Sequence, residues 1–333
     1  ASDVYKRQFI GRHGHHLAFH CIRFNARKQE RVFTPPAAWY TGENAALDAA
    51  GKGARVQHPA KWRATADPFA LPYRSFEPVE VLGCPHAGND VFQMRGLYRG
   101  RLVEAYVKVA RRSGAGVCNE LAVLAALECP LAPEVIDYDA RGGRFLVTLA
   151  KPGERLSTIL QGNPHASPCD YLPAYGRALA RLHGASGAFP AMRERQVFCL
   201  RDGAFFADNG LEDVRAYLLA RRPPSPPCFC HGDFHYANLL WEGGRLSGIL
   251  DFELAGMGDP SRDIAWALLR RPGQAFLDTP GQIDRFLDGY GNCDRAAVRW
   301  WMVQFYTWYY DALAQDAAYR AFVRGELERL CAL

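Results

Sequence analysis

The apolar residues change their spacing along the chain, and this change limits the folds that the chain can adopt. Between residues 76 and 151, short segments alternate apolar and polar side chains, which is the pattern of half-buried strands. One segment, residues 114–129, has instead the spacing of an amphipathic helix. Beyond Asp263 the pattern is helical to the end of the chain. This order predicts an α+β chain with a small sheet-rich lobe followed by a larger, mainly helical lobe.

Local signals place several elements within this order. FEPVEVLG reads as a strand over residues 76–83, and a tight turn at Gly100 joins two further strands. A second hairpin turns at Gly142–Gly143, and an amphipathic helix over residues 169–183 stops at Gly184. The strand LVEAYVKV should place Lys108 on one face of the sheet. Its other face should carry four apolar residues: Val103, Ala105, Val107 and Val109.

Residues 1–73 differ from the rest in composition and charge. They are rich in Ala, Gly and Pro, so we expect a poorly structured or non-native leader before lobes at 74–151 and 152–333. Residues 1–75 hold 12 Lys and Arg against 5 Asp and Glu, whereas the rest holds 28 against 30. The net charge of +5 therefore comes from the leader, which argues against nucleic acid as a partner of the body. A metal site is not the favoured interpretation of its histidines, His13, His15, His16 and His20.

Membrane and disulfide signals are weak in this sequence. No run reaches the roughly 18 apolar residues of a membrane helix, and we find no signal peptide, so we expect no membrane partner. The ten cysteines contain no CxxC pair, and one residue separates Cys228 from Cys230, which suits neither a disulfide nor a zinc knuckle. We expect reduced thiols in a cytoplasmic protein, and we do not favour a metal site made by Cys228, Cys230 and His231.

Polar residues concentrate in FCHGDFHYANLLW, at 229–241, and GILDFELAGMGDP, at 248–260. Asp233, Asn238 and Asp251 stand at the ends of short apolar runs, where a buried carboxylate is costly unless it is paired or holds a metal. Transfer of a phosphoryl group from a nucleotide needs a carboxylate to accept the proton of the attacking hydroxyl and oxygen ligands for magnesium. It also needs an amino group on the phosphates, which Lys108 paired with Glu120 could supply. The competing interpretations are a turn-capping role for Asp233 and a solvated strand residue at Lys108.

These segments resemble the aminoglycoside phosphotransferase family, the kinase-like small-molecule phosphotransferases that include choline-kinase-like members. HGDFHYANLL is similar to the HGDxxxxN catalytic loop, and ILDFE to the metal-binding segment. GDPSRDIAW and GRALARLHG resemble two further family motifs, and VEAYVKVA with NEL matches the strand Lys and helix Glu. The resemblance covers roughly residues 76–320, and its strength lies in the order and spacing of the whole set.

The resemblance implies a protein-kinase-like fold with nucleotide binding in the first lobe and the catalytic loop and acceptor site in the second. It implies that Asp233 is the catalytic base, that His231 braces its loop, and that Asp263 fixes the loop and the following helix. Magnesium would be bound by Asn238 and Asp251. The implied nucleotide contacts are Lys108 held by Glu120 at the α and β phosphates, the backbone around Leu149 and Lys151 at the adenine, and Gly88 and Asn89 in the loop over the phosphates.

Two departures from kinase patterns bear on these implications. CPHAGNDVF lacks the GxGxxG pattern of protein kinases, so the phosphate loop has fewer glycines. Glu253 follows Phe252 where protein kinases have Gly, and an acidic residue there is found in choline-kinase-like members. This favours a small-molecule kinase, with Glu253 at the metal site or facing the substrate.

We therefore expect transfer of the γ-phosphoryl group of ATP or GTP, with Mg²⁺, to a hydroxyl of a small molecule such as an aminoglycoside, an amino alcohol or a sugar. The alternative is a catalytically silent nucleotide-binding regulatory module. The aromatic segment RWWMVQFYTWYY could form a cage for a cationic substrate, but its helical spacing favours core packing. The sequence predicts neither the acceptor nor the oligomeric state.

Overall fold

The computed structural model describes residues 32–33, 65–85, 89–111, 115–162, 166–220, 225–272, 274, 276–277, 279–311 and 316–332. The described residues form two compact units. The sheet unit consists of the described parts of residues 9–117 and 135–150, and the helical unit of residues 118–134 and the described parts of 151–333.

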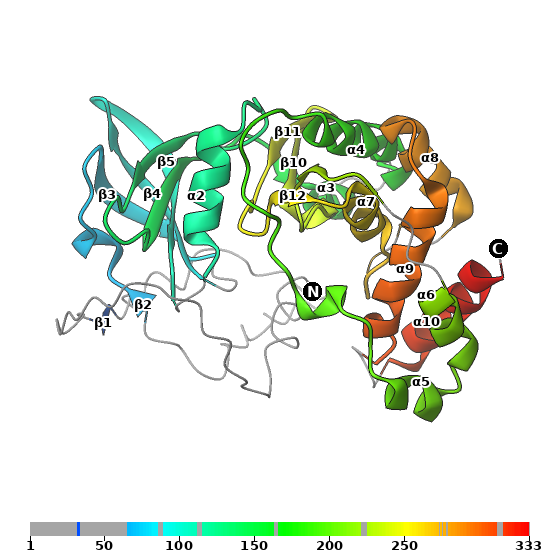
Figure 1. Cartoon of the computed structure of the whole chain (residues 1–333). Coiled ribbons are helices and arrows are strands. Elements are labelled where there is room, and N and C mark those ends of the chain that lie inside the picture. Colours follow the sequence, from blue (N-terminus) through cyan, green and yellow to red (C-terminus); the bar gives the residue numbers. More distant parts are fainter. Residues whose placement is uncertain are drawn as a thin grey trace, which may run out of the picture. The chain divides into compact units, whose positions relative to one another are not determined.

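The sheet unit contains a five-stranded antiparallel sheet in the order β3-β4-β5-β7-β6. Figure 1 labels its strands β3, β4 and β5. Its strands are β3 (Phe76–Gly83), β4 (Asp90–Tyr98), β5 (Arg101–Val109), β6 (Val135–Tyr138) and β7 (Phe145–Leu149). Arg99 and Gly100, both at positive φ, form the two-residue turn between β4 and β5, as expected for a hairpin with right-handed strand twist. The predicted strand and both predicted hairpins are therefore confirmed.

A continuous apolar core lies on one face of this sheet. In β5 the alternation is as predicted, because Ala105, Val107 and Val109 are buried and Val103 packs against the same cluster. Lys108 alternates with them and is only half-buried. Strand pairing and one buried face together fix the register that positions Lys108 in the sheet.

A buried carboxylate ties the segment before β3 to the far edge of the sheet. Asp137 Oδ2 accepts the backbone N–H groups of Arg74, Ser75 and Phe76 at 2.7, 2.7 and 2.9 Å. Earlier in the chain, β2 (Thr65–Ala66) pairs with β1 (Val32–Phe33), and a 3₁₀ helix at Pro68–Ala70 follows β2. Residues 65–73, which the sequence placed in the poorly structured leader, are thus in regular or hydrogen-bonded structure; the other leader residues apart from β1 lie outside the described residues.

The helical unit holds most of the helices, and a short set of strands carries the predicted polar cluster. Its helices are α2 (Val117–Ala126, of which Val117 groups with the sheet unit), α3 (Leu156–Gly162), α4 (Pro168–His183), α5 (Gly203–Asn209), α6 (Glu212–Ala220), α7 (Pro260–Leu268), α8 (Pro280–Tyr290), α9 (Arg295–Tyr309) and α10 (Ala317–Cys331). Its strands are β8 (Glu154–Arg155), β9 (Cys228–Cys230), β10 (Leu239–Glu242), β11 (Arg245–Ile249) and β12 (Gly256–Gly258). The strands pair as β11-β10-β8 and β12-β9.

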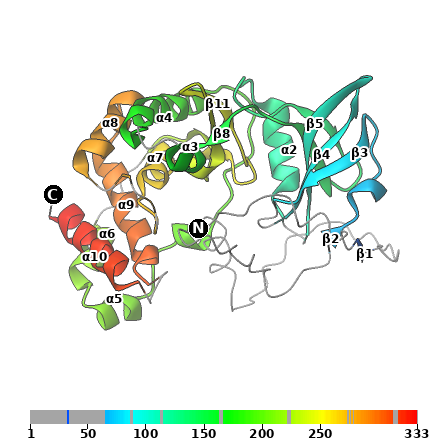
Figure 2. The ribbon, with the colours of Figure 1, turned by 180° about the vertical axis from the view of Figure 1, so that it is seen from behind.

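Helix packing builds one large core in this unit. Helices α4 and α8 lie side by side (Figures 1 and 2), and a Cβ atom at Gly176 would collide with the backbone of Phe286, so glycine permits their close approach. The aromatic segment in α9 is largely core, because Trp301 and Phe305 are buried. Trp308, the third residue of the same helical repeat, is only half-buried, and its Nε1 donates to the carbonyl of Cys199 at 2.7 Å. Gly184 caps α4, as predicted, and its N–H bonds to the carbonyl of Ala180.

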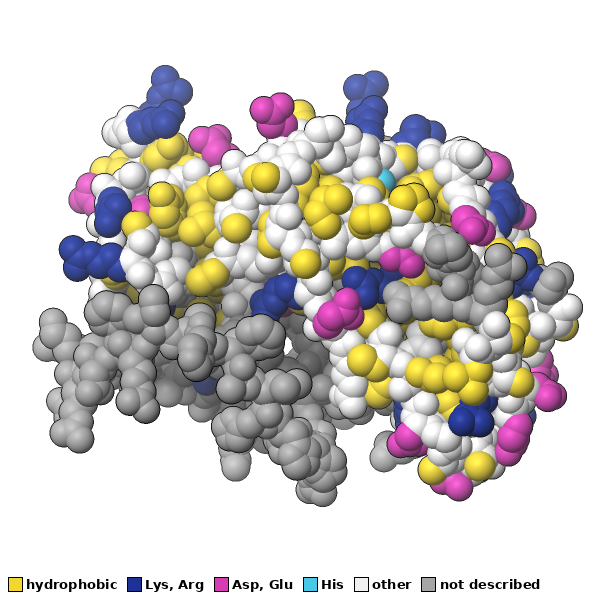
Figure 3. Space-filling model, in the orientation of Figure 1, with side chains coloured by type: hydrophobic (Ala, Val, Ile, Leu, Met, Phe, Trp, Pro, Cys, Tyr) yellow, Lys and Arg dark blue, Asp and Glu magenta, His cyan; other side chains and the backbone are white. Residues whose placement is uncertain are grey.

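The surface of the described residues is mixed in charge. On the face that Figure 3 shows, Lys and Arg side chains lie among Asp and Glu side chains, in keeping with the near balance of charge after residue 75. None of the described helices is both long enough and apolar enough to span a bilayer.

Candidate active site

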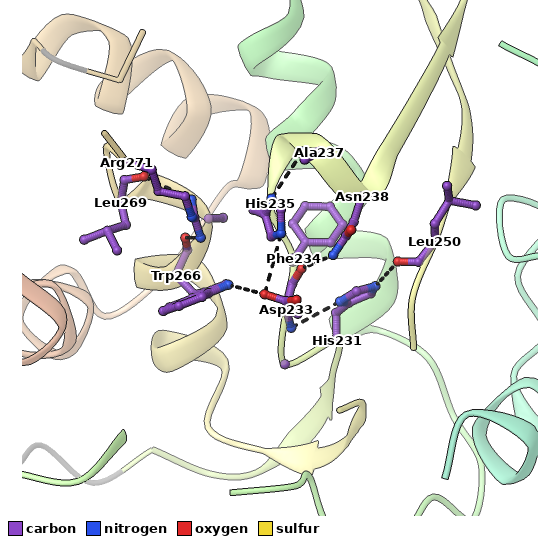
Figure 4. Close-up of polar contacts among 12 residues, drawn as sticks. His231, Asp233, Phe234, His235, Ala237, Asn238, Leu250, Trp266, Leu269 and Arg271 are labelled. Carbon is purple, nitrogen blue, oxygen red and sulfur yellow. Dashed lines mark hydrogen bonds and ion pairs between the residues drawn. The ribbon is translucent and has the colours of Figure 1, made fainter. Parts of the chain in front are cut away.

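The predicted catalytic loop runs from His231 to Asn238, between β9 and β10, and its backbone conformation depends on a glycine. Gly232 has φ +77°, and a Cβ atom there would lie 2.8 Å from the carbonyl oxygen of Leu254. The loop ends in a 3₁₀ turn over Tyr236–Asn238, where the His235 ring accepts the N–H of Ala237 (Figure 4). Glycine thus permits both the positive φ and the close approach to residue 254.

Asp263, the fourth residue of α7, holds the start of this loop. Its carboxylate accepts the backbone N–H of His231 at 2.6 Å and that of Gly232 at 3.0 Å, and it lies 3.3 Å from His183 Nε2. Burial by itself raises the pKa of the Asp263 carboxyl, but the hydrogen bond and charge of His183, together with His231, outweigh burial and hold that pKa below its ordinary value. The contacts agree with the expectation that Asp263 fixes the loop.

His231 is fully buried and links the loop to the segment before Asp251. Its Nδ1 accepts the N–H of Asp233 at 3.2 Å, so the ring proton is assigned to Nε2, which lies 3.1 Å from the carbonyl oxygen of Leu250 (Figure 4). Both ring nitrogens are therefore hydrogen-bonded to backbone groups. These contacts are in keeping with the bracing role that the resemblance implies for His231, which stays a prediction.

The Asp233 side chain is buried and held by two donors. Trp266 Nε1 donates to Asp233 Oδ1 at 2.8 Å, and Arg195 Nη1 lies 3.3 Å from the same oxygen (Figure 4 shows Trp266 and Asp233). His235 Nε2 lies 3.7 Å from this oxygen. These contacts fix the orientation of the carboxylate, which is what a base must have before an acceptor hydroxyl arrives.

A hairpin explains why Asn238 and Asp251 come together despite their separation in sequence. Strands β10 and β11 pair Leu239 with Ile249, so the residue before one strand and the residues after the other are neighbours. The N–H of Leu250 accordingly donates to the carbonyl of Asn238 at 2.8 Å. Asp251, the next residue, has φ +70°, a conformation that non-glycine residues adopt rarely and often at functional sites.

The side chains at this junction offer oxygen ligands. Asn238 Nδ2 donates to the carbonyl of Asp233 at 2.9 Å, so its Oδ1 is not the atom used in that bond. An amide oxygen and the carboxylate of Asp251 are the hard donors that Mg²⁺ prefers, so the residues present fit this ion.

The remaining predicted residues divide between the two units. Lys108 in β5, the buried Asn89 before β4, and Leu149 at the end of β7 lie in the sheet unit. Glu120 and Lys151 lie in the helical unit, where Glu120 Oε1 accepts the N–H of Phe252 at 3.2 Å and Lys151 Nζ donates to the carbonyl of Pro130 at 2.7 Å. The pairing of Lys108 with Glu120 stays a prediction, and Gly88 lies outside the described residues.

Glu120 and its neighbour also fix the segment that follows Asp251. Asn119 Nδ2 donates to the carbonyls of Glu253 and Ala255 at 3.2 and 2.9 Å. Together with the bond from Phe252 to Glu120, these contacts hold the backbone just after the proposed metal ligand. The roles of Glu253 that the sequence left open, at the metal site or facing the substrate, remain open.

The cysteine cluster differs from the one that the sequence considered. The ligand atoms of Cys228, Cys230 and His183 lie within 4.8 Å of one another, whereas the His231 ring contacts Leu250 and Asp233. His183 is the last residue of α4, and α4 packs on β9, the strand that carries both cysteines, so His183 belongs to this cluster. Its Nδ1 lies 2.8 Å from the hydroxyl oxygen of Tyr290 and its Nε2 lies near Asp263, so the ring already belongs to the hydrogen-bond network that holds the loop.

Sequence reasoning missed two residues that contact the predicted base. Trp266 reads as an ordinary apolar residue of a helix, and Arg195 stands in a segment without a motif. Both reach Asp233 through tertiary packing, from 33 and 38 residues away. The only local signal was the position of Trp266 three residues after Asp263, almost one helical turn along the same helix.

Comparison with known proteins gives the family and the fold. The model of the phosphotransferase enzyme family matches residues 88–301. A similar solved structure is a thermostable mutant of aminoglycoside phosphotransferase APH(4)-Ia in its apo form, with 16% identity, 77% of this chain and 95% of that chain covered, and a TM-score of 0.51. A choline/ethanolamine kinase family protein from Mesorhizobium loti has 21% identity, 80% and 88% coverage and a TM-score of 0.45. No match was found among curated protein sequences.

The predicted protein-kinase-like α+β fold and the predicted resemblance are both confirmed. The predicted enzyme class, a small-molecule kinase with a hydroxyl group as acceptor, is confirmed with them. With its family model matched over residues 88–301, the chain belongs to the phosphotransferase enzyme family.

Proposed function

We propose that this phosphotransferase moves the γ-phosphoryl group of ATP or GTP to a hydroxyl group of a small molecule, with Mg²⁺ as its cofactor. The observation that carries the proposal is one hydrogen-bond network that joins Asp233, Asn238 and the segment bearing Asp251. It supplies an oriented carboxylate and two oxygen ligands on two hydrogen-bonded loops, which is what phosphoryl transfer requires of a protein.

In the proposed reaction, Asp233 accepts the proton of the acceptor hydroxyl as that oxygen attacks the γ-phosphorus. The bond from the γ-phosphorus to the bridging oxygen breaks, and the nucleoside diphosphate leaves. Asn238 and Asp251 would hold Mg²⁺, which neutralises charge on the phosphates when bound. His231 keeps the loop in place, because its two ring nitrogens bond to the N–H of Asp233 and to the carbonyl of Leu250.

The sheet unit would bind the nucleotide. We propose that Lys108, held by Glu120, contacts the α and β phosphates, that the backbone at Leu149 and Lys151 faces the adenine, and that Gly88 and Asn89 lie over the phosphates. The regular pairing of β5 with β4 and β7 supports a fixed position for Lys108 within the sheet.

The setting that we propose is the cytoplasm. The nine cysteines that the structure describes are free thiols, which suits a reducing compartment.

A catalytically silent nucleotide-binding module is the alternative. It would not need a carboxylate oriented by Trp266 and Arg195, so the geometry around Asp233 favours the enzyme.

The test is phosphoryl transfer from ATP and from GTP, each with Mg²⁺, to a panel of amino alcohols, sugars and aminoglycosides, with products identified by mass spectrometry. A phosphorylated acceptor formed by the wild-type protein and not by Asp233→Asn supports the proposal. Tight nucleotide binding without any phosphorylated product would favour the silent module.

A further inference from the structure

Arg195 is a charged side chain that contacts the proposed base. It precedes the 3₁₀ helix Gln196–Phe198, and its Nη1 lies 3.3 Å from Asp233 Oδ1. Its guanidinium carbon also lies 4.9 Å from the ring centroid of Trp266 and 6.0 Å from that of Phe198. Two aromatic faces and one carboxylate therefore hold the guanidinium in place.

The pairing of Arg195 with Asp233 leaves capacity for another partner. A guanidinium has five N–H donors in a planar fork, and the hydrogen bond to Asp233 uses one nitrogen. The Arg195 side chain is 28% exposed, whereas that of Asp233 is 8% exposed. Arg195 can therefore hold the base and, on its exposed side, the oxygens of a second anionic group.

Two further arginines of the described residues pack against these aromatic rings. Arg271 is buried, lies 4.8 Å from the Trp266 ring centroid, and donates to the carbonyls of Trp266 and Leu269. Arg262 lies 4.3 Å from the Phe198 ring centroid and pairs with the largely exposed Glu194.

Three carboxylates of this region already accept bonds from protein donors, and one of them, Glu194, pairs with Arg262. Asp263 accepts backbone N–H groups of the loop, and Asp259 accepts the Ser261 N–H and Trp301 Nε1. A polycationic acceptor that approached Asp233 would therefore meet a fixed guanidinium, whereas an anionic acceptor would gain charge-assisted hydrogen bonds from it.

We propose that Arg195 binds an anionic oxygen group of the acceptor, so that the acceptor is a hydroxyl compound bearing a carboxylate or a phosphate. This inference rests on the proposed function, because it assigns the substrate class of the same site. Arg195 then determines specificity by placing the acceptor hydroxyl beside Asp233.

Four compounds with a three-carbon skeleton provide the test: glycerate, glycerol phosphate, glycerol and 2-amino-1,3-propanediol. They offer a carboxylate, a phosphate, no charge and an ammonium group. With Mg²⁺ and the preferred nucleotide, we expect the wild-type protein to use at least one anionic compound with kcat/KM about tenfold or more above the other two, since charge-assisted bonds are the strong ones. Whether glycerate or glycerol phosphate has the higher kcat/KM shows whether the acceptor bears a carboxylate or a phosphate.

Variants at Arg195 make the test specific. Because Arg195 also orients Asp233, Arg195→Gln should lower kcat for every acceptor, but it should raise KM about tenfold or more for the anionic acceptor and not for glycerol. Arg195→Lys should restore part of this KM because it keeps the charge without the planar fork. Arg285→Gln, an exposed position on α8, is the matched control and should behave as wild type. Thermal unfolding of each variant shows whether it is folded.

Two results would overturn the inference while leaving the proposed function intact. One is equal or better use of the neutral or cationic compound, and the other is an equal change of KM for all acceptors in Arg195→Gln. Calorimetric titration covers the case without turnover. Binding of an anionic compound that Arg195→Gln abolishes would support the anion site and count against the proposed transfer, whereas no binding of either anionic compound would overturn the inference.

Discussion

The side-chain amide of Asn238 donates a hydrogen bond of 2.9 Å to the backbone carbonyl of Asp233. This bond spans the catalytic loop and turns one end of the amide toward the base. The same residue accepts the N–H of Leu250 through its backbone. One residue therefore connects the proposed base to the segment that carries the second proposed metal ligand.

Removal of the proposed base should stop transfer without stopping nucleotide binding. In Asp233→Asn we expect kcat to fall by roughly 10²–10⁴, the usual contribution of a general base. Stabilisation by Mg-nucleotide should persist, because Asn238 and Asp251 are unchanged. Steady-state kinetics with thermal unfolding checks both, and Asp288→Asn, an exposed residue of α8, is the control. Undiminished turnover in Asp233→Asn would remove Asp233 from the mechanism.

Alanine at Gly232 should destabilise the protein more than alanine at another positive-φ glycine. Gly232 has φ +77° and Leu254 stands 2.8 Å from the new Cβ atom, whereas Gly210 has φ +61° and nothing within 4 Å. Gly210→Ala should therefore show only the backbone strain, about 1–2 kcal/mol, and Gly232→Ala that strain plus the steric clash. Urea unfolding measures both variants. Equal losses would mean that the loop adjusts to the added atom.

The stability of the protein should depend on pH through Asp263. Its pKa is lower in the folded protein than its ordinary value, so the folded state keeps the carboxylate ionised where the unfolded chain takes up a proton. This contribution is present above the ordinary Asp pKa of about 3.9 and is lost as the pH falls further. In the wild type, the free energy of unfolding measured with urea should therefore decrease as the pH is lowered from about 5.

Asp263→Asn should flatten this pH dependence. It should also cost about 3–5 kcal/mol at neutral pH, because it removes one partner of a buried charged network. Asp284→Asn breaks an exposed pair with Arg295 and is the control, with an expected effect below about 1 kcal/mol. An unchanged acid dependence in Asp263→Asn would contradict the assignment.

Two half-buried thiols should differ in reactivity. The hydrogen bond from Cys230 lowers the pKa of Cys228 against the effect of burial, whereas burial and Asp90 raise the pKa of Cys84 to about 11. Because the thiolate is the nucleophile, iodoacetamide should modify Cys228 at lower pH than Cys84. Site-resolved mass spectrometry gives both rate profiles. Cys230→Ala should move the Cys228 profile to higher pH, and identical profiles in the wild type would refute the prediction.

The sequence predicted those parts of the fold and site that depend on local spacing. Nineteen residues of sequence hold Asp233, Asn238 and Asp251. A hairpin with turn glycines at Gly243 and Gly244 lies between Asn238 and Asp251, so a local turn is enough to bring these residues together. The strand alternation around Lys108 was visible for the same reason.

The missed contacts depend on packing between distant segments. Arg195 reaches Asp233 because the chain before the 3₁₀ helix packs on Trp266, and His183 reaches Asp263 because α4 packs on β9. Neither relationship has a fixed spacing in the sequence. This is also why His231 was considered beside Cys228 and Cys230, where the structure places His183.

Thermal unfolding with Mg-ATP and Mg-GTP tests whether the site at Asn238 and Asp251 binds a magnesium nucleotide. A ligand that binds only the native state stabilises it by about 2.7 kcal/mol at 100 times its Kd. We expect a magnesium-dependent rise in Tm with at least one nucleotide in the wild type, and its loss in Asp251→Asn. No rise with either nucleotide, or an undiminished rise in Asp251→Asn, would contradict the proposed metal-nucleotide site.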